Sequence, residues 1–149
     1  MAALTIKGGD KLEAALRDMA RNVAKASTLS VGFLEGATYP DGTPVPLVAA
    51  VQEFGAPSRN IPPRPFFRGM IADKSPEWPR AIGEALRATD FDGERTLELT
   101  GAGIKGQLQQ AIATFVGVPL KPATIAKKGF DKQLVDTGHM MNSVDYIVK

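Results

Sequence analysis

Apolar and polar positions near the start of the chain follow first a strand-like and then a helical pattern. Leu4–Ile6 favours a short strand that Gly8 and Gly9 would close. From residue 10 to residue 26, apolar residues recur every three or four positions, which is the spacing of an amphipathic helix. Asp10 precedes Glu13 by three residues, close to a capping box, so we expect the N-cap at Asp10. The apolar residues of this predicted helix are Leu12, Leu16, Met19 and Val23.

Two later segments alternate apolar and polar side chains with a period of two, which is typical of half-buried strands. They cover residues 29–33 and 144–148. The few strands, the several helices and the lack of strict βαβ alternation predict a single α+β domain over residues 1–149. In this domain a small antiparallel β-sheet is packed by several α-helices. Between the strands, helices are expected over residues 47–54, about 65–73, from Ser75 with Pro76 onward, and about 94–116.

The longest predicted helix, over about 94–116, carries three glycines within six residues. Each glycine costs up to about 1 kcal/mol of helix propensity relative to alanine. We therefore expect a bend at Gly101, Gly103 and Gly106, or the close approach of another backbone. The apolar stripe of this helix is Leu97, Ile104, Leu108, Ile112 and Phe115.

Long proline-rich loops interrupt this pattern at residues 35–46 and 57–64. Tyr39–Gly42 has the composition of a tight turn. Pro62 and Pro63 favour an extended, solvent-facing segment, because proline fixes φ and cannot donate a backbone hydrogen bond. Pro65 suits the first turn of a helix. That helix is expected to carry Phe66, Met70 and Ile71 inward.

The composition is ordinary for a soluble domain and excludes several classes of site. The chain has 149 residues, of which 44% are hydrophobic and 23% charged, and it has no cysteine. Disulfides, thiolate metal sites and cysteine nucleophiles are therefore excluded, and a reducing compartment fits the chain. No apolar run reaches the roughly 18 residues that span a bilayer, so no membrane partner is expected. The formal charge of +2 is spread along the chain, unlike that of a dedicated nucleic-acid binder.

Leu134–Gly138 contains Asp136-Thr137-Gly138, the motif of aspartic proteases. In those enzymes two such aspartates share a proton. A single copy would need a homodimer, only 11 residues follow Gly138, and His139 stands where those enzymes carry a small residue. We therefore interpret Asp136 and Thr137 as capping a short turn over 138–142 before the last strand.

No other segment predicts catalysis, a metal or a cofactor. His139 is the only histidine, so one subunit cannot form a multi-histidine site, and we expect it at the surface or at a cap. Gly101–Gly106 is only superficially like a nucleotide-binding loop, because it lies inside a helical pattern. The densest basic patch is either a solvated loop or a set of phosphate contacts in a DNA channel. Its residues are Lys121, Lys127, Lys128 and Lys132.

Several segments in a fixed order resemble small virion proteins of tailed bacteriophages. Val31–Phe33 is followed by Ala49–Gly55 and by Ile61–Phe67. Pro122–Ile125 and Lys128 then precede Leu134–Gly138 and Asn142-Ser143-Val144. These segments are similar to those of neck, or tail-completion, proteins, and the resemblance runs from about residue 29 to the end. The chain departs from its relatives at His139-Met140-Met141, where Arg and then Leu are common.

The resemblance implies a non-enzymatic structural subunit that forms a ring, often a hexamer, at the head–tail junction. Such a subunit helps to complete the tail and join it to the filled capsid. Its partners would be sister copies and other neck and tail proteins, with non-specific contact to genomic DNA as a further candidate. It would be assembled in the bacterial host cytoplasm and reside in the virion. A tail-terminator subunit is the nearest alternative, and a DNA-binding module is the third.

A ring subunit needs arms that reach its neighbours, and proline lowers the entropy cost of ordering such arms. We expect Phe66 and Phe67 to anchor the 57–64 arm to its own domain, and Phe66 is as consistent with an interface as with plain core. Arginine and aromatic residues are common interface anchors. The interface candidates are Tyr39, Arg59, Arg64, Phe66 and Arg68.

Overall fold

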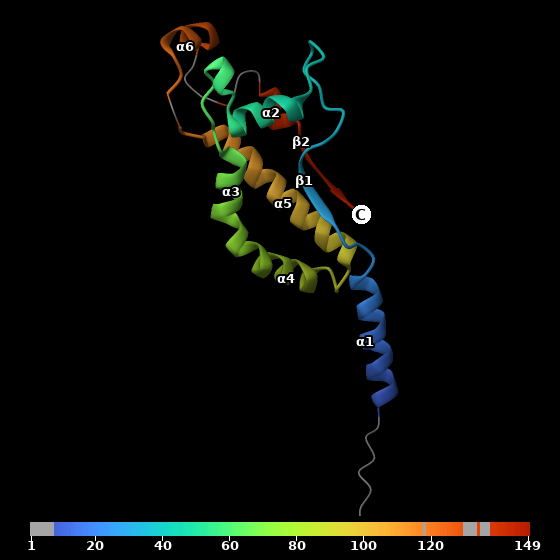
Figure 1. Ribbon diagram of the computed structural model, residues 1–149. Coiled ribbons are helices and arrows are strands. Elements are labelled where there is room, and N and C mark those ends of the chain that lie inside the picture. Colours follow the sequence, from blue (N-terminus) through green and yellow to red (C-terminus); the bar gives the residue numbers. More distant parts are fainter. Residues whose placement is uncertain (1–7, 118, 130–133, 135–137) are drawn as a thin grey trace, which may run out of the picture.

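The computed structural model describes residues 8–117, 119–129, 134 and 138–149, apart from the side chain of Lys128 (Figure 1). It confirms the α+β class, with helices packed around a two-stranded antiparallel sheet. The described elements, in chain order, are α1 (Gly9–Val23), β1 (Leu29–Phe33), α2 (Val45–Phe54), the 3-10 turn η1 (Pro57–Arg59), α3 (Phe66–Lys74), the 3-10 turn η2 (Ser75–Glu77), α4 (Trp78–Ala88), α5 (Gly93–Thr114), α6 (Pro122–Lys128), α7 (His139–Asn142) and β2 (Val144–Val148).

The sheet joins the two segments whose period of two predicted strands. Leu29 pairs with Val148 at one end of the ladder, and Phe33 pairs with Val144 at the other. Helix α5 packs against this sheet at Gly101, where an added Cβ would lie 2.5 Å from the Tyr146 ring and 2.8 Å from Leu29 Cδ1. A close approach thus occurs at Gly101, but the atoms that approach are side chains of the sheet and not the other backbone that was expected. No such neighbour lies within 4 Å of a Cβ added at Gly103 or Gly106.

The core is built on the C-terminal half of α5, which contacts α3, α7 and β2. Leu108 and Ile112 of the predicted stripe are 0% and 1% exposed, which confirms the buried face of this helix. Phe66 and Met70 of α3 are also buried, but the expectation for Ile71 is wrong, since it is 37% exposed. The side of α3 that faces the core carries Phe66 and Met70, and Ile71 lies at the edge of that side. The buried apolar residues among those described are Val45, Ala49, Phe66, Met70, Leu108, Ile112, Leu134, Met140 and Val144.

Two expected helix caps are wrong. Helix α1 begins one residue before Asp10, and its N-cap is Gly8, whose φ of 100° favours glycine. Ser75 is not an N-cap but the C-cap of α3, and the 3-10 turn η2 carries the chain from there directly into α4. The long helix expected from about residue 94 begins at Gly93, and there the Asp92 carboxylate accepts a hydrogen bond from the Arg95 amide at 3.1 Å.

The polar loop expected around Lys127 is also wrong, because helix α6 occupies this segment. Pro122 stands in its first turn, and Gly129, with φ of 78°, ends it. Both are standard helix-end signals, since proline needs no amide partner in the first turn and glycine tolerates a left-handed C-terminus. The strand expected at Leu4–Ile6 and the cap expected at Asp136 and Thr137 lie outside the described residues.

Helix α1 has a different environment from every other long helix. It projects away from the rest of the molecule and meets it only near its C-terminal end (Figure 1). There the Val23 carbonyl lies against Gly93, the first residue of α5, so closely that a Cβ at Gly93 would overlap it. None of the residues of α1 is buried.

Candidate functional site

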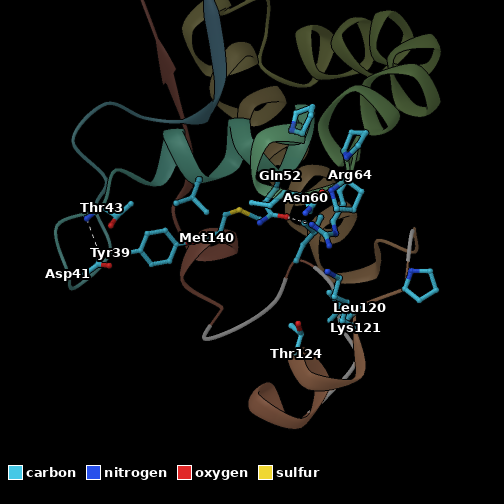
Figure 2. Close-up of a pocket in the computed structure, with 17 residues that line it drawn as sticks. Tyr39, Asp41, Thr43, Gln52, Asn60, Arg64, Leu120, Lys121, Thr124 and Met140 are labelled. Atoms are coloured by element: carbon cyan, nitrogen blue, oxygen red, sulfur yellow. Dashed lines mark hydrogen bonds between the residues drawn. The ribbon is translucent and has the colours of Figure 1, made fainter.

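One cleft, with a volume of about 1130 Å³, is lined by three of the interface and DNA-contact candidates. We call it the Arg64 cleft (Figure 2). Tyr39 comes from the loop before α2, Arg64 from the segment before α3, and Lys121 from the segment before α6. The three lie up to 82 positions apart in the sequence, so the fold alone brings them together. The lining also includes Asp41, Thr43, Gln52, Asn60, Thr124, Leu134, Met140 and four prolines.

Arg64 is the unusual group of this cleft. The residue is only 8% exposed, and its guanidinium donates to Gln52 Oε1 at 2.7 Å. Among the described residues its Nε atom has no hydrogen-bond partner, and no carboxylate pairs with it. Burial lowers the pKa of Arg64, because removal from water disfavours the charged form. A buried cation without a counter-charge costs free energy, so an acidic group entering the cleft would be stabilised there.

Asp41 lines the same cleft but is engaged in its own turn. Its carboxylate accepts a hydrogen bond from the Thr43 amide at 2.9 Å, and this bond lowers the pKa of Asp41. The Gly42 amide donates to the Tyr39 carbonyl at 2.9 Å, which confirms the tight turn predicted over Tyr39–Gly42. The acidic group in the lining therefore stabilises the loop rather than neutralising Arg64.

His139 ties this loop to helix α7. Its Nε2 lies 2.8 Å from the Thr38 carbonyl oxygen, and its ring lies 4.8 Å from the Tyr39 ring, centroid to centroid. The next residue, Met140, is 4% exposed and belongs to the core. Tyr39 and His139 thus position one wall of the cleft, and His139 is half-buried rather than a plain surface residue.

The first part of the 57–64 segment, residues 57–61, is not an extended arm. Ala56 and Ile61 exchange two backbone hydrogen bonds, at 2.9 and 3.1 Å, so the residues between them close into a compact loop around η1. Gly55, with φ of 76°, allows this closure, since an added Cβ there would lie 2.8 Å from the Ile61 carbonyl oxygen. Arg59 remains exposed in this loop.

Glu53, which sequence reasoning missed, holds α2 against the start of α3. This carboxylate is 5% exposed and accepts hydrogen bonds from the Phe67 amide at 2.9 Å and the Arg68 amide at 3.2 Å. Its second contact with Arg68 is an ion pair to Nε at 2.7 Å. Because Pro65 supplies no side-chain cap, Glu53 satisfies the free amides of α3 from the neighbouring helix.

The interface candidates Phe66 and Arg68 lie beside a second hollow, the β1 groove. This groove has a volume of about 410 Å³ between β1, the end of α2 and the start of α3. Phe66 itself is 2% exposed, so it anchors its own domain and leaves no surface for a neighbouring subunit. Arg68 keeps 57% of its side chain exposed and covers the Phe54 ring at 4.9 Å. The groove is lined mainly by Val31, Phe33, Ala49, Ala50, Phe54 and Phe67.

The stripe of apolar residues on α1 forms a further surface, which we call the α1 ridge. Leu12 and Leu16 are 62% and 55% exposed, and Met19 and Val23 are 37% and 38% exposed. The apolar face was predicted from the sequence, but its exposure was not. Side chains of this size at helical spacing are normally buried against a partner.

The predicted basic patch is only partly placed by the structure. Lys121 is exposed at the N-cap of α6 and lines the Arg64 cleft, and Lys127 is exposed near the end of α6. The side chain of Lys128 and the whole of Lys132 lie outside the described residues. The structure therefore leaves the DNA contact of these four lysines a prediction.

Other site types were sought in the part of the chain that the structure describes. It contains no cluster of three or more histidine, aspartate or glutamate side chains that could hold a metal ion. None of its helices combines the length and the apolar character that crossing a bilayer requires. Comparison with family models, with curated proteins and with solved structures gives no match to this chain.

Proposed function

We propose that this chain is a self-assembling, non-catalytic structural subunit of a tailed-bacteriophage virion, forming a ring at the neck or at the end of the tail. The observation that carries the proposal is the α1 ridge. Four large apolar side chains are 37–62% exposed on a helix that has no buried residue among those the structure describes. Exposed apolar surfaces of this kind mark interaction sites.

The free energy of this exposure favours association. A helix of 15 residues is marginally stable in water by itself, and most helical stability comes from packing of the apolar face. Full burial of one leucine, methionine or valine side chain is worth about 1.5–3 kcal/mol. Covering the ridge would therefore stabilise α1 and the assembly together.

The phage setting rests on the ordered resemblance described above. The matching segments supply structural parts of the fold: Val31–Phe33 lies in β1, Ala49–Gly55 ends α2, and Ile61–Phe67 leads through the Arg64 cleft into α3. These segments build surfaces rather than bringing nucleophiles, bases or metal ligands together. This is the arrangement that a structural subunit requires.

The Arg64 cleft supplies a second contact in this proposal. An acidic side chain of a neighbouring subunit or neck protein would neutralise the buried guanidinium. Lys121 on the rim of the same cleft adds to the positive potential. A charge-assisted hydrogen bond of this kind gives an interface orientation as well as affinity.

The two alternative functions differ from a neck subunit in the partner that is bound or in the part that charge plays in binding. A tail-terminator subunit would use the same ridge and ring, and would sit at the tail end instead of the neck. A DNA-binding module would bind duplex as a monomer, and its affinity would fall steeply with rising salt. The even mixture of 18 basic and 16 acidic residues along the chain favours the structural subunit.

Sedimentation velocity of the full chain across a range of concentrations tests the proposal. We expect a discrete multi-subunit species that resists moderate salt, since apolar contacts hold it together. Purified virus particles should contain the chain in several copies, measurable by quantitative mass spectrometry. A chain that sediments as a monomer at every concentration and is missing from particles would refute the proposal.

A further inference from the structure

We propose that the α1 ridge of one copy seats in the β1 groove of a second copy, so that the subunits join head to tail. This inference rests on the proposed self-assembly and names the surface that receives the ridge. The ridge is convex and the groove concave, and both are apolar surfaces of the same chain. Contacts between two different surfaces of identical subunits close into rings when the rotation allows it.

The ridge is held away from the groove of its own chain. The linker between α1 and β1 is fixed along its length, because the amides of Ser27 and Thr28 donate to the Lys149 carbonyl at 2.9 and 3.0 Å. Lys25 lies 3.6 Å from the Asp92 carboxylate, at the start of α5. These contacts direct α1 outward (Figure 1), so the ridge needs a second molecule.

The two surfaces have comparable lengths. From Leu12 to Val23 the ridge covers eleven helical steps, or about 16 Å at the α-helical rise. The groove is lined on one long side by Ser30–Leu34, which cover four strand steps, or about 13 Å at the rise of a strand. The ridge spacing of four, three and four residues also gives a narrow apolar stripe, which suits a groove better than a broad surface.

The borders of the two surfaces are also compatible. Ala15 and Ala20 lie beside the ridge, and their small side chains allow the helix to approach closely. Glu13 borders the ridge with a side chain that pairs with Arg17 and is 66% exposed, and Arg68 borders the groove with one that pairs with Glu53 and is 57% exposed. Opposite charges at the rim set the orientation of an interface more than its affinity.

The test uses two arginine substitutions that each disable one surface. Leu16→Arg places a charge on the ridge, and Ala50→Arg fills the groove. Each variant alone should sediment as a monomer. An equimolar mixture should form a one-to-one heterodimer, because one intact groove and one intact ridge remain. Ala14→Arg on the polar face of α1 and Ala72→Arg on the exposed face of α3 are the matched controls, and both should keep the wild-type size.

A milder variant guards against misfolding. Phe54→Ala removes a groove side chain that is 64% exposed, so its thermal unfolding should match the wild type, while self-association weakens at least tenfold, as for an interface anchor. If Ala50→Arg and Phe54→Ala keep the wild-type size while Leu16→Arg is monomeric, the ridge binds another ridge. That result overturns the groove inference and leaves self-assembly intact. A monomeric wild type overturns both.

Discussion

Helices α1 and α5 carry equally regular apolar stripes, yet they end in opposite environments. On α5, Leu108 and Ile112 are 0% and 1% exposed, whereas on α1, Leu12 and Leu16 are 62% and 55% exposed. The difference lies in what surrounds each helix. The sheet, α3, α4 and α7 all contact α5, while α1 touches α5 only near the C-terminal end of α1. An amphipathic pattern thus tells which face requires burial, but not whether its own chain supplies the cover.

The largest expected effect is the difference in stability between a leucine substitution in α5 and one in α1. Leu108→Ala should lower the free energy of unfolding by about 2–5 kcal/mol, because it leaves a cavity in a fully buried site. Leu16→Ala, measured at concentrations where the chain is monomeric, should change it by less than about 0.5 kcal/mol. Urea unfolding of both variants gives the comparison. Similar losses would mean that α1 packs against its own chain in solution.

Glu53→Gln tests how much the polar contacts between α2 and α3 contribute to stability, in addition to the apolar core. The substitution weakens the bonds from the Phe67 and Arg68 amides and removes the charge that pairs with Arg68. A loss of about 2–3 kcal/mol is expected, since hydrogen bonds to charged groups are the stronger ones. Glu98→Gln, at an exposed position of α5, is the control. An equally small change in both variants would show that Glu53 does not hold α3.

Two glycines of α5 sharpen the comparison within one helix. Gly101→Ala should destabilise by about 1–3 kcal/mol, because its Cβ would overlap Tyr146 and Leu29. Gly103→Ala meets no such neighbour and should stabilise by up to about 1 kcal/mol through helix propensity. Thermal unfolding of the pair measures the sign of each change. Stabilisation by both alanines would mean that α5 lies farther from the sheet.

The smallest expected effect is on the pH dependence of stability, through two surface carboxylates. A hydrogen bond from Lys105 lowers the pKa of Asp145, and the Arg95 amide lowers that of Asp92. Carboxyl groups with a depressed folded pKa stabilise the protein above the ordinary value of about 4, and this contribution is lost as pH falls through the folded pKa. Unfolding measured between about pH 5 and 2 should therefore show a shallower decline for Asp145→Asn. An unchanged slope would show that Asp145 contributes nothing.

Signals contained in a few neighbouring residues predicted their elements well. The alternation at 29–33 and 144–148, the stripe of α5 and the helix end at residue 54 all correspond to observed structure. Even the missed helix α6 carried its local signals, proline in the first turn and glycine at the end. The arm predicted at 57–64 was wrong for residues 57–61, because the bonds between Ala56 and Ile61 close them into a loop.

By itself, the sequence determined the α+β class, the two strands, the faces of α1 and α5 and the residue types available for a site, because periodicity and turn chemistry act over a few residues. Only the tertiary structure decided that Arg64 is buried without a carboxylate among the described residues, that Glu53 caps α3, and that the α1 ridge is exposed. Glu53 meets its partners across 14 and 15 positions, and Tyr39 and Lys121 share a cleft across 82. Such distances are closed by packing of the whole chain, which no local pattern encodes.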